Sequence, residues 1–363
     1  MKIKDLCSYA PKSRIKAGEA VENAKYLFFT SSADENKRYT DFQFDKEAII
    51  MGTGGNATLH YYNGKFSVST DCLVLFPNSK IKCKYLYYFF KSHMSVLEAG
   101  FKGAGLKHTN KKYIEEINIS KVPDLSIQEK IVSHLDTITE NIEKLNRELE
   151  LFDSLTKARF IEMFGEPVNN DKGWVKDSVE RLCREIYGGG TPSKSHPEYY
   201  EGGKIPWITS KDMKTDILID SQIHINEDGV ANSTARIVPK NSVIMVIRSG
   251  ILKHTLPVAI NAVPVTVNQD LKVFVAGNRI VTKFLAYQFK MMERDILSGV
   301  RAVTADNIEF DALKRRELIV PPIELQQEFA DFVEQVDKSR EEVKKSLEKT
   351  QQLYDSLMQE YFG

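Results

Sequence analysis

Two stretches of the chain carry apolar residues at alternating spacings of four and three, a pattern typical of helices that pair along one seam. The seam of the first stretch consists of Ile131, Leu135, Ile138, Ile142, Leu145, Leu149 and Phe152. The seam of the second consists of Phe329, Val333, Val336, Val343 and Leu347, with Arg340 and Thr350 at two positions of the same register. Polar seam residues cost stability but can fix register and pairing. We therefore predict two long helices of the coiled-coil type.

The two stretches are copies of one segment. Val122-Pro123 and Gln128 recur as Val320-Pro321 and Gln326, and Phe164-Gly165 recurs as Phe362-Gly363, each 198 residues later. Because the residue before a proline disfavours helix, each helix is expected to start near Ser126 or Glu324. At 1.5 Å per residue, a helix over 127–163 would be about 55 Å long, the dimension of a spacer. A simple helical hairpin would show the same seam, but two copies separated by a large segment indicate a duplicated unit.

The segments outside these helices contain short apolar runs that are typical of strands. Ala48-Ile49-Ile50-Met51 resembles Ser242-Val243-Ile244-Met245, and the amphipathic stretch 84–90 resembles 283–289. The expected order is therefore globule, helix, globule, helix. We place these segments at 1–119, 120–165, 166–319 and 320–363, and expect α+β or α/β globules related by a pseudo-twofold internal repeat.

Length and composition indicate a folded protein with more than one core, since 363 residues exceed one ordinary domain. The hydrophobic share of 42% and the charged share of 28% are typical of soluble proteins. No apolar run approaches the roughly 18 residues of a membrane helix, and the start lacks the apolar core of a signal peptide, so we expect a cytoplasmic protein without a membrane partner. The four cysteines and seven histidines are dispersed, which favours reduced, buried cysteines over a metal site.

The formal net charge of zero conceals a segregation of charge along the chain. Residues 1–119 carry 18 Lys and Arg against 12 Asp and Glu, a net of +6, and residues 166–319 carry 21 against 19, a net of +2. The predicted helical segments carry 6 against 9 and 5 against 10, nets of −3 and −5. Because DNA repels acidic surfaces, the helices should face protein or solvent, and only the globules suit DNA.

The sequence resembles the specificity (HsdS) subunits of Type I restriction-modification systems over essentially its whole length. The residues that carry the resemblance are Gly188-Gly189-Gly190-Thr191-Pro192-Ser193, the run from Ile205-Pro206-Trp207 to Met213, and the two Val-Pro and Gln helix entries. The resemblance implies two target-recognition domains, each reading half of a split double-stranded DNA site. It also implies antiparallel spacer helices that separate the halves and dock two methyltransferase subunits, with a motor and nuclease (restriction) subunit joining through the complex.

The first globule departs from the family pattern. It has Ala10-Pro11-Lys12-Ser13-Arg14 where the Gly-rich loop would come, and it is shorter by about 22 residues, since the offset between the copies grows from 176 to 198. No family residue is therefore carried over to this globule. The domain assignment itself rests on the repeat.

Catalytic motifs are missing from the sequence. A methyltransferase would show a Gly-rich cofactor loop and an Asn/Asp-Pro-Pro-aromatic motif, whereas Gly52-Thr53-Gly54-Gly55 lacks the GxGxxG spacing. The Gly-rich segment 188–195 fails the P-loop register because Ser193 precedes Lys194. We expect a non-catalytic chain that binds no cofactor and no metal. S-adenosylmethionine, Mg²⁺ and ATP would belong to the partner subunits, as the resemblance implies.

Candidate DNA-binding residues are those that can bind phosphates or base edges from loops. In the C-terminal globule they are Thr191, Ser193 and Lys194 in a Gly-rich loop expected to be flexible, Ser210 and Lys211 after the Trp strand, and Arg248, Ser249, Lys253 and His254. In the N-terminal globule they are Lys37, Arg38, Asn56, Lys65, Lys107, His108, Asn110, Lys111 and Lys112. Arg248 follows a predicted strand, where it could contact guanine or simply be an exposed strand-end arginine.

Two other functions agree with the same pattern. The chain could be the specificity subunit, or a severed domain, of a single-chain (Type IIG-like) restriction enzyme, which co-purifying partners would distinguish. It could also be a coiled-coil scaffold whose globules bind proteins, which a gel shift with random duplexes would distinguish.

Overall fold

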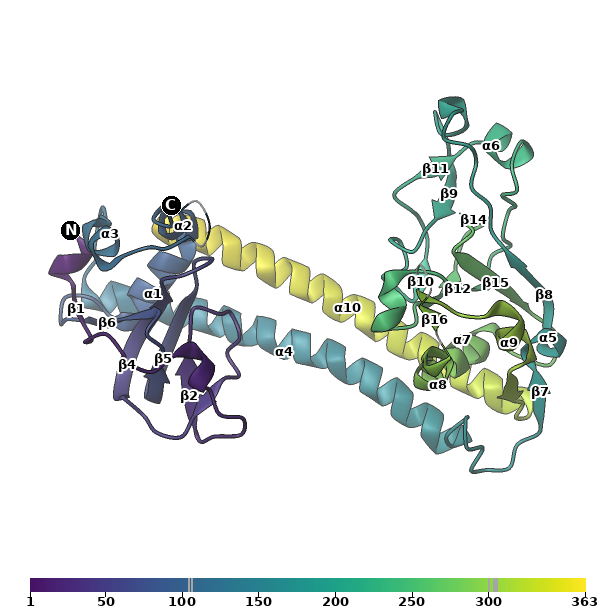
Figure 1. Ribbon diagram of the computed structural model, residues 1–363, viewed down its shortest axis with the longest axis horizontal. Helices are drawn as coiled ribbons and strands as arrows, with labels where there is room; N and C mark the ends of the chain where they lie inside the picture. Colours follow the sequence, from purple (N-terminus) through teal and green to yellow (C-terminus); the bar gives the residue numbers. More distant parts are fainter. Residues whose placement is uncertain (104, 106, 300, 303–305) are drawn as a thin grey trace. The chain divides into compact units, whose positions relative to one another are not determined.

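The computed structural model describes residues 1–363 except 104, 106, 300 and 303–305 (Figure 1). The chain divides into two compact units: unit 1 comprises 1–147 and 343–363, and unit 2 comprises 148–342. The two predicted long helices are α4 (Leu125–Phe164) and α10 (Ile323–Phe362), each of 40 residues and each starting one residue before the expected position. Each unit contains one globule and a part of both helices.

Unit 1 is built on a six-stranded sheet of order β1-β6-β4-β5-β2-β3. Its strands are β1 (Cys7–Tyr9), β2 (Tyr26–Phe29), β3 (Arg38–Tyr39), β4 (Phe44–Gly52), β5 (Leu59–Val68) and β6 (Cys72–Pro77). Its shorter helices are α1 (Cys83–Ser92), α2 (Met94–Ala99), α3 (Lys111–Glu116), η1 (Ile3–Asp5) and η2 (Ala17–Glu19). Apolar side chains of β4 are buried on both faces of the sheet: Ile49 packs in the core that contains α1, and Ile50 packs on the other side with Phe29 and Phe66. This explains why β4 ends in a continuous apolar run.

Unit 2 has a five-stranded sheet of order β10-β13-β12-β15-β8, a three-stranded sheet of order β11-β9-β14 and two strand pairs. Its strands are β7 (Lys176–Ser178), β8 (Cys183–Gly188), β9 (Ile205–Ile208), β10 (Ile217–Leu218), β11 (His224–Ile225), β12 (Val243–Val246), β13 (Val258–Asn261), β14 (Thr266–Val267), β15 (Leu271–Ala276), β16 (Arg301–Ala302), β17 (Asp306–Asn307) and β18 (Glu317–Ile319). Its shorter helices are α5 (Val179–Leu182), α6 (Glu227–Ala231), α7 (Thr282–Met291), α8 (Glu293–Ser298), α9 (Phe310–Arg315), η3 (Pro197–Tyr199) and η4 (Gly250–Lys253).

The two units repeat one arrangement of strands and helices. In unit 1, β4 lies between β5 and β6 with Ile49 opposite Leu75; in unit 2, β12 lies between β13 and β15 with Val243 opposite Phe274. The helix that follows is α1 in one unit and α7 in the other. The internal repeat predicted from the sequence is therefore present in the fold.

A buried glutamine attaches each long helix to its unit. Gln128 and Gln326 are both fully buried. The Gln326 amide accepts a hydrogen bond from the Val281 N–H (2.9 Å) and donates to the carbonyls of Arg279 (3.2 Å) and Pro321 (2.8 Å). Gln128 makes the same three bonds, and its partners are Lys82 N–H (2.7 Å), Lys80 C=O (3.2 Å) and Pro123 C=O (2.7 Å). These three hydrogen bonds, made by both glutamines, are the physical reason for the repeated Val-Pro and Gln motif.

Within each unit the parts of α4 and α10 lie side by side and run in opposite directions (Figure 1). In unit 2, Asp153 pairs with Arg340 (2.6 Å) and Arg159 pairs with Glu328 (2.9 Å), so residue numbers rise on one helix as they fall on the other. In unit 1, the His134 ring lies 3.0 Å from the Tyr361 hydroxyl. Arg340, which interrupts the predicted seam, is thus engaged by a carboxylate of the facing helix.

The predicted seam residues all lie on the inner side of the two helices. The first three of each copy are buried, and the others are half-buried: Ile131, Leu135, Ile138, Phe329, Val333 and Val336, then Ile142, Leu145, Leu149, Phe152, Val343 and Leu347. The repeated Phe-Gly, which lies beyond the predicted seam, closes each helix end with an aromatic residue. Phe164 packs on Phe284 of α7 (ring centroids 4.8 Å apart), and Phe362 packs on Tyr85 of α1 (5.2 Å), at the repeated Phe-Gly.

The four cysteines are buried and not disulfide-bonded. Burial raises the pKa of Cys7 and of Cys183 to about 12, so these thiols stay protonated near neutral pH. None of the helices that the structure describes is both long and apolar enough to cross a membrane.

Candidate nucleic-acid interface

The Gly-rich loop of unit 2 lies directly on neighbouring backbone. A Cβ atom at Gly189 would be 1.9 Å from the Val267 carbonyl oxygen, so a larger residue cannot fit there. The Gly190 N–H donates to that carbonyl (2.9 Å), and the Gly190 carbonyl accepts from the indole of Trp207 (3.0 Å). The two most distinctive motifs of this globule therefore pack on one another. Our expectation of a flexible loop was wrong for its start, because these hydrogen bonds hold it; the exposed part begins near Ser193.

The turn between β14 and β15 joins two groups of candidates that are far apart in the sequence. Thr191 of the Gly-rich loop hydrogen bonds to the Gln269 side chain. Arg248, after β12, binds the Asp270 carboxylate through Nε (2.7 Å) and Nη2 (2.6 Å). Asn268 is buried and donates to Asp270 (3.1 Å), which stiffens the turn. Sequence reasoning missed Asn268, Gln269 and Asp270, and their only signal was a polar run between two short strands.

Arg248 is exposed over 49% of its side chain but is already engaged. The Nε hydrogen bond and the Nη2 ion pair both go to the Oδ1 atom of Asp270, and about half of the side chain stays exposed. Of the two interpretations of the sequence, contact with guanine stays a prediction, and the ion pair with Asp270 shows that Arg248 is more than an exposed strand-end arginine. Asp270 orients the guanidinium, which still has donors for a ligand.

The remaining candidates of unit 2 show less specific contacts. Ser249 caps η4 by accepting a hydrogen bond from Ile251 N–H (3.4 Å), which is a structural role. The hydroxyls of Ser193 and Ser195 lie 2.7 Å apart in the exposed loop. Exposed or half-buried positions are occupied by Lys194, Ser210, Lys211, Lys253 and His254.

In unit 1, the loop after β4 meets the segment before α3. Gly55 N–H donates to the Lys107 carbonyl (2.9 Å), and Thr109 N–H donates to the Thr53 carbonyl (3.0 Å). These bonds bring the exposed residues Asn56, Lys107 and His108 together. Lys102, which the sequence reading missed, is also exposed and pairs with His108 through backbone hydrogen bonds of 3.0 Å in each direction.

Other candidates of unit 1 hold the protein's own structure. The Asn110 side chain caps α3 by accepting from Tyr113 N–H (3.0 Å), and the Lys111 ammonium lies 4.6 Å from the Tyr9 ring centroid. Lys112 is exposed on the same helix. Arg38 donates to the carbonyls of Glu35 and Lys37 and so closes the loop between β2 and β3.

Two further lysines lie in different places along the sheet. The Lys37 ammonium donates to Thr30 (3.2 Å), next to Ser31, whose hydroxyl accepts from the N–H groups of Thr53 and Gly54. Lys37 is therefore near the loop after β4. Lys65 lies 3.9 Å from Asp45 at the start of β4, so it does not join this cluster.

The two units place their candidates at equivalent positions. In unit 1 an isolated bridge joins Gly54 to His108, and in unit 2 one joins Arg248 to Asn307. The neighbouring bond from Ile308 N–H to the Ile247 carbonyl (2.8 Å) corresponds to the bond between Thr109 and Thr53. We call these places the strand-end sites: 53–56 with 107–109 in unit 1, and 247–249 with 307–308 in unit 2. Each follows the equivalent strand, β4 or β12.

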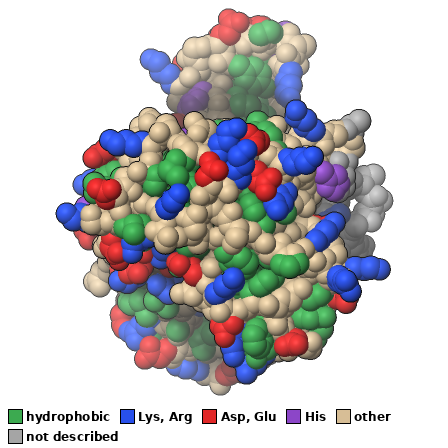
Figure 2. Space-filling model, turned by 90° about the vertical axis from the view of Figure 1, so that its left-hand side faces the viewer, with side chains coloured by type: hydrophobic (Ala, Val, Ile, Leu, Met, Phe, Trp, Pro, Cys, Tyr) green, Lys and Arg blue, Asp and Glu red, His purple; other side chains and the backbone are tan. Residues whose placement is uncertain are grey.

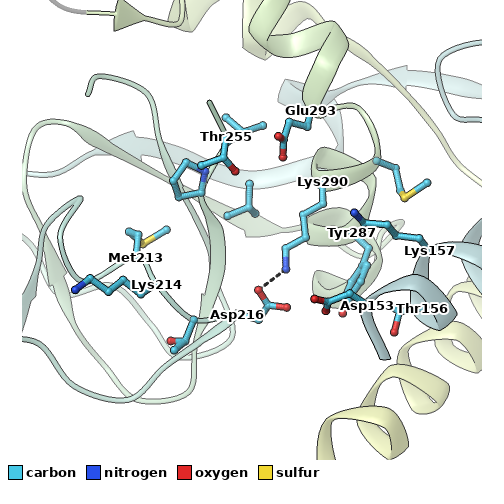
Figure 3. A pocket seen from close by; sticks show the side chains of 15 residues that line it. Asp153, Thr156, Lys157, Met213, Lys214, Asp216, Thr255, Tyr287, Lys290 and Glu293 are labelled. Carbon is cyan, nitrogen blue, oxygen red and sulfur yellow. Dashed lines mark ion pairs between the residues drawn. The ribbon is translucent and has the colours of Figure 1, made fainter. Parts of the chain in front are cut away.

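The cavity in Figure 3 offers a different kind of site in unit 2. It has a volume of about 320 Å³ and is lined by α4 around Thr156, by α7 and the start of α8, and by the segments before β10 and β13. Lys290 pairs with Asp216 (2.6 Å) across it, and burial together with nearby carboxylates raises the pKa of Tyr287. Its lining contains both acidic and basic side chains, namely Asp153, Asp216 and Glu293 together with Lys157, Lys214 and Lys290.

A family model described as the Type I restriction modification DNA specificity domain matches residues 1–151 and again 172–352. The chain belongs to this family. Its two matched spans each contain one globule and most of the following long helix, as the internal repeat requires. A chain of this family confers DNA specificity in a Type I restriction-modification system and is itself non-catalytic.

Individual relatives agree with this membership. The chain is 28% identical to the Type I restriction enzyme EcoR124I/EcoR124II specificity subunit of Escherichia coli, over 83% of this chain and 76% of that protein. Its fold matches the crystal structure of the Type-I restriction-modification system S subunit from M. genitalium with a TM-score of 0.71 at 16% identity, covering 100% of this chain and 95% of that one. A second solved chain, from a study of complex assembly and conformational transition of the type I R-M system, matches with a TM-score of 0.56 at 14% identity, covering 100% and 96%.

Proposed function

We propose that each strand-end site reads one half of a two-part DNA sequence, and that exposed faces of α4 and α10 bind methyltransferase subunits. The observation that carries the proposal is the equivalent position of two sites with unlike side chains. Unit 1 presents Asn56, Lys107 and His108, whereas unit 2 presents Arg248, whose partner Asp270 follows the exposed Gln269 in the chain. Two equivalent sites with different side chains are suited to binding two different DNA half-sites.

The chemistry of the two sites supports base reading. Asparagine and glutamine amides pair with adenine, and arginine pairs with guanine, in the major groove. Lysines beside them can bind phosphates and so position the reading groups. In the face drawn in Figure 2, Lys and Arg side chains are scattered among Asp and Glu side chains and form no single basic surface. On that face, phosphate contacts would come from individual lysines and arginines and not from one continuous basic surface.

Exposed leucines on the long helices support a protein-binding role. Leu151 and Leu155 of α4 are 65% and 48% exposed in unit 2, and Leu353 of α10 is 51% exposed in unit 1. Leu155 and Leu353 occupy the same position of the repeat, 198 residues apart. Acidic helices with exposed leucines suit a protein partner better than DNA, and a surface that occurs twice suits two copies. S-adenosylmethionine, Mg²⁺ and ATP would then enter with the methyltransferase and restriction subunits.

The test is methylome sequencing of a host that carries the chain with its methyltransferase subunits. We expect a modified motif in two parts with a gap of fixed length. His108→Ala should relax one part and Arg248→Ala the other, because the two residues belong to different units. A contiguous motif, or one variant that alters both parts equally, would refute the proposal.

A further inference from the structure

A group of three cations lies beside the strand-end site of unit 2. Lys272 is on β15 opposite Gly188, and its ammonium lies 4.5 Å from the centroid of the Phe310 ring. The Lys314 ammonium lies 4.6 Å from the centroid of the same ring. Arg248 is close enough to act on Lys272 electrostatically. An aromatic face attracts cations, so Phe310 holds two ammonium groups near each other despite their repulsion.

The three cations differ in how they are neutralised. Asp270 binds Arg248 at 2.6 Å, and Asp311 lies 3.3 Å from Lys314. Among the residues that the structure describes, no hydrogen bond or ion pair engages the Lys272 ammonium. Burial lowers the pKa of Lys272, and the charges of Lys314 and Arg248 lower it further. A half-buried ammonium beside two other cations is unfavourable until an anion joins it.

The Gly-rich loop leaves room for this ammonium. A Cβ at Gly188 would lie 2.5 Å from the Lys272 nitrogen, so the lysine extends over the glycine where the loop begins. Its charge is therefore presented between the Gly-rich loop and the strand-end site, the two parts of unit 2 that we assign to DNA. The anion available at that place is a backbone phosphate.

We propose that Lys272, assisted by Lys314, binds one phosphodiester of the DNA backbone next to the half-site read by unit 2. This inference rests on the proposed function. The contact belongs to one unit alone, because the position equivalent to Lys272 in the register of unit 1 is Leu73. The DNA next to the half-site of unit 2 is thus bound by a lysine that has no counterpart in unit 1. Lys272 contributes affinity without contacting a base.

Lys272→Leu is a suitable variant because leucine already occupies the equivalent position in unit 1. One phosphate contact contributes about 0.9 to the slope of log K against log[salt], where K is the association constant for DNA. Its loss lowers the affinity about fivefold at about 0.15 M salt. We expect Lys272→Leu to lose this slope and affinity, while the methylated motif stays the same. Lys272→Arg should retain most of the binding. Lys272→Leu should be at least as heat-stable as the native chain, since it removes a charge that is repelled by Lys314 and Arg248.

The measurement is a salt titration of binding by the full chain with its methyltransferase subunits, on a duplex carrying the methylated motif. The matched control is Lys240→Leu, which removes an exposed charge before β12, at the end away from Arg248. Gly188→Ala is a second variant, because the new methyl group would displace the Lys272 ammonium. The lysine side chain is flexible and can move aside, so we expect the fold to be unchanged. A neutral methylphosphonate at the contacted phosphate should weaken the native chain and leave Lys272→Leu unaffected.

The outcomes separate this inference from the proposed function. If Lys272→Leu and Lys240→Leu share the native slope while the native chain binds its motif, Lys272 does not bind phosphate and the inference fails alone. If the native complex shows no sequence preference in DNA binding, the proposed function fails first. A relaxed base in the motif of Lys272→Leu would also overturn the inference, since it would make this lysine a base reader.

Discussion

Gln326→Leu should destabilise unit 2 because it removes three hydrogen bonds at a fully buried position. The Val281 N–H would be left without its acceptor, which costs about 1–3 kcal/mol for a buried donor. The carbonyls of Arg279 and Pro321 would each lose a donor, at about 1 kcal/mol apiece. Leucine recovers about 1 kcal/mol through its apolar surface. The net loss is about 2–4 kcal/mol in the free energy of unfolding.

Urea unfolding followed by tryptophan fluorescence measures this loss in unit 2, because both tryptophans, Trp174 and Trp207, lie in that unit. With an m-value of about 2 kcal/mol/M, the midpoint should fall by about 1–2 M. The matched control is Gln327→Leu, one residue later, whose side chain is exposed and donates a hydrogen bond to Asp331 (2.8 Å). A midpoint shift no larger than in this control would refute the role we assign to the buried glutamine.

Three further predictions concern the loop, the reading site and the pH response. Gly189→Ala should lower Tm by several degrees, because its Cβ would lie 1.9 Å from the Val267 carbonyl oxygen. Gly250→Ala is the control, since Gly250 has open space around it, and equal melting curves of the two variants would contradict the prediction. Asp270→Ala should weaken DNA binding of the complex, because Arg248 loses the carboxylate that orients it, and unchanged affinity in a gel shift would count against that orientation. Lys2 and Lys4 lower the pKa of Glu116 to about 2 from 4.5, so their contribution to stability is present above about pH 4.5 and is lost as the pH falls towards 2. The Tm difference between the native chain and Glu116→Gln should therefore shrink over that range, and a difference that persists at pH 2 would refute the assignment.

The long helices could be predicted from the sequence because their determinants are local and periodic. The seam spacing reports one face of a helix, and the Val-Pro entry ends the extended segment before it. The starts at Leu125 and Ile323 differ from the expected positions by one residue. The duplication was visible for the same reason, since equal spacing between motifs survives even where the globules diverge.

The sites could be predicted only in part. Arg248 and the Gly-rich loop were singled out by residue type and by their place after strands. Their meeting at Gln269 and Asp270 depends on the pairing of β8, β12 and β15, which no local pattern specifies. The side-chain oxygen of Asn110 caps α3, which its residue type did not reveal, and its contact with DNA stays a prediction.

The sequence by itself determined the repeat, the two long helices and the difference in net charge between the basic globules and the acidic helices. Only the tertiary structure decided which polar residues stay available to a ligand. Gln128 and Gln326 are buried, Arg248 is oriented by a carboxylate, and Lys272 has no carboxylate partner among the residues that the structure describes. The physical reason is that helical periodicity acts over neighbouring residues, whereas the neutralisation of a charge depends on partners brought close by strand register from distant parts of the chain.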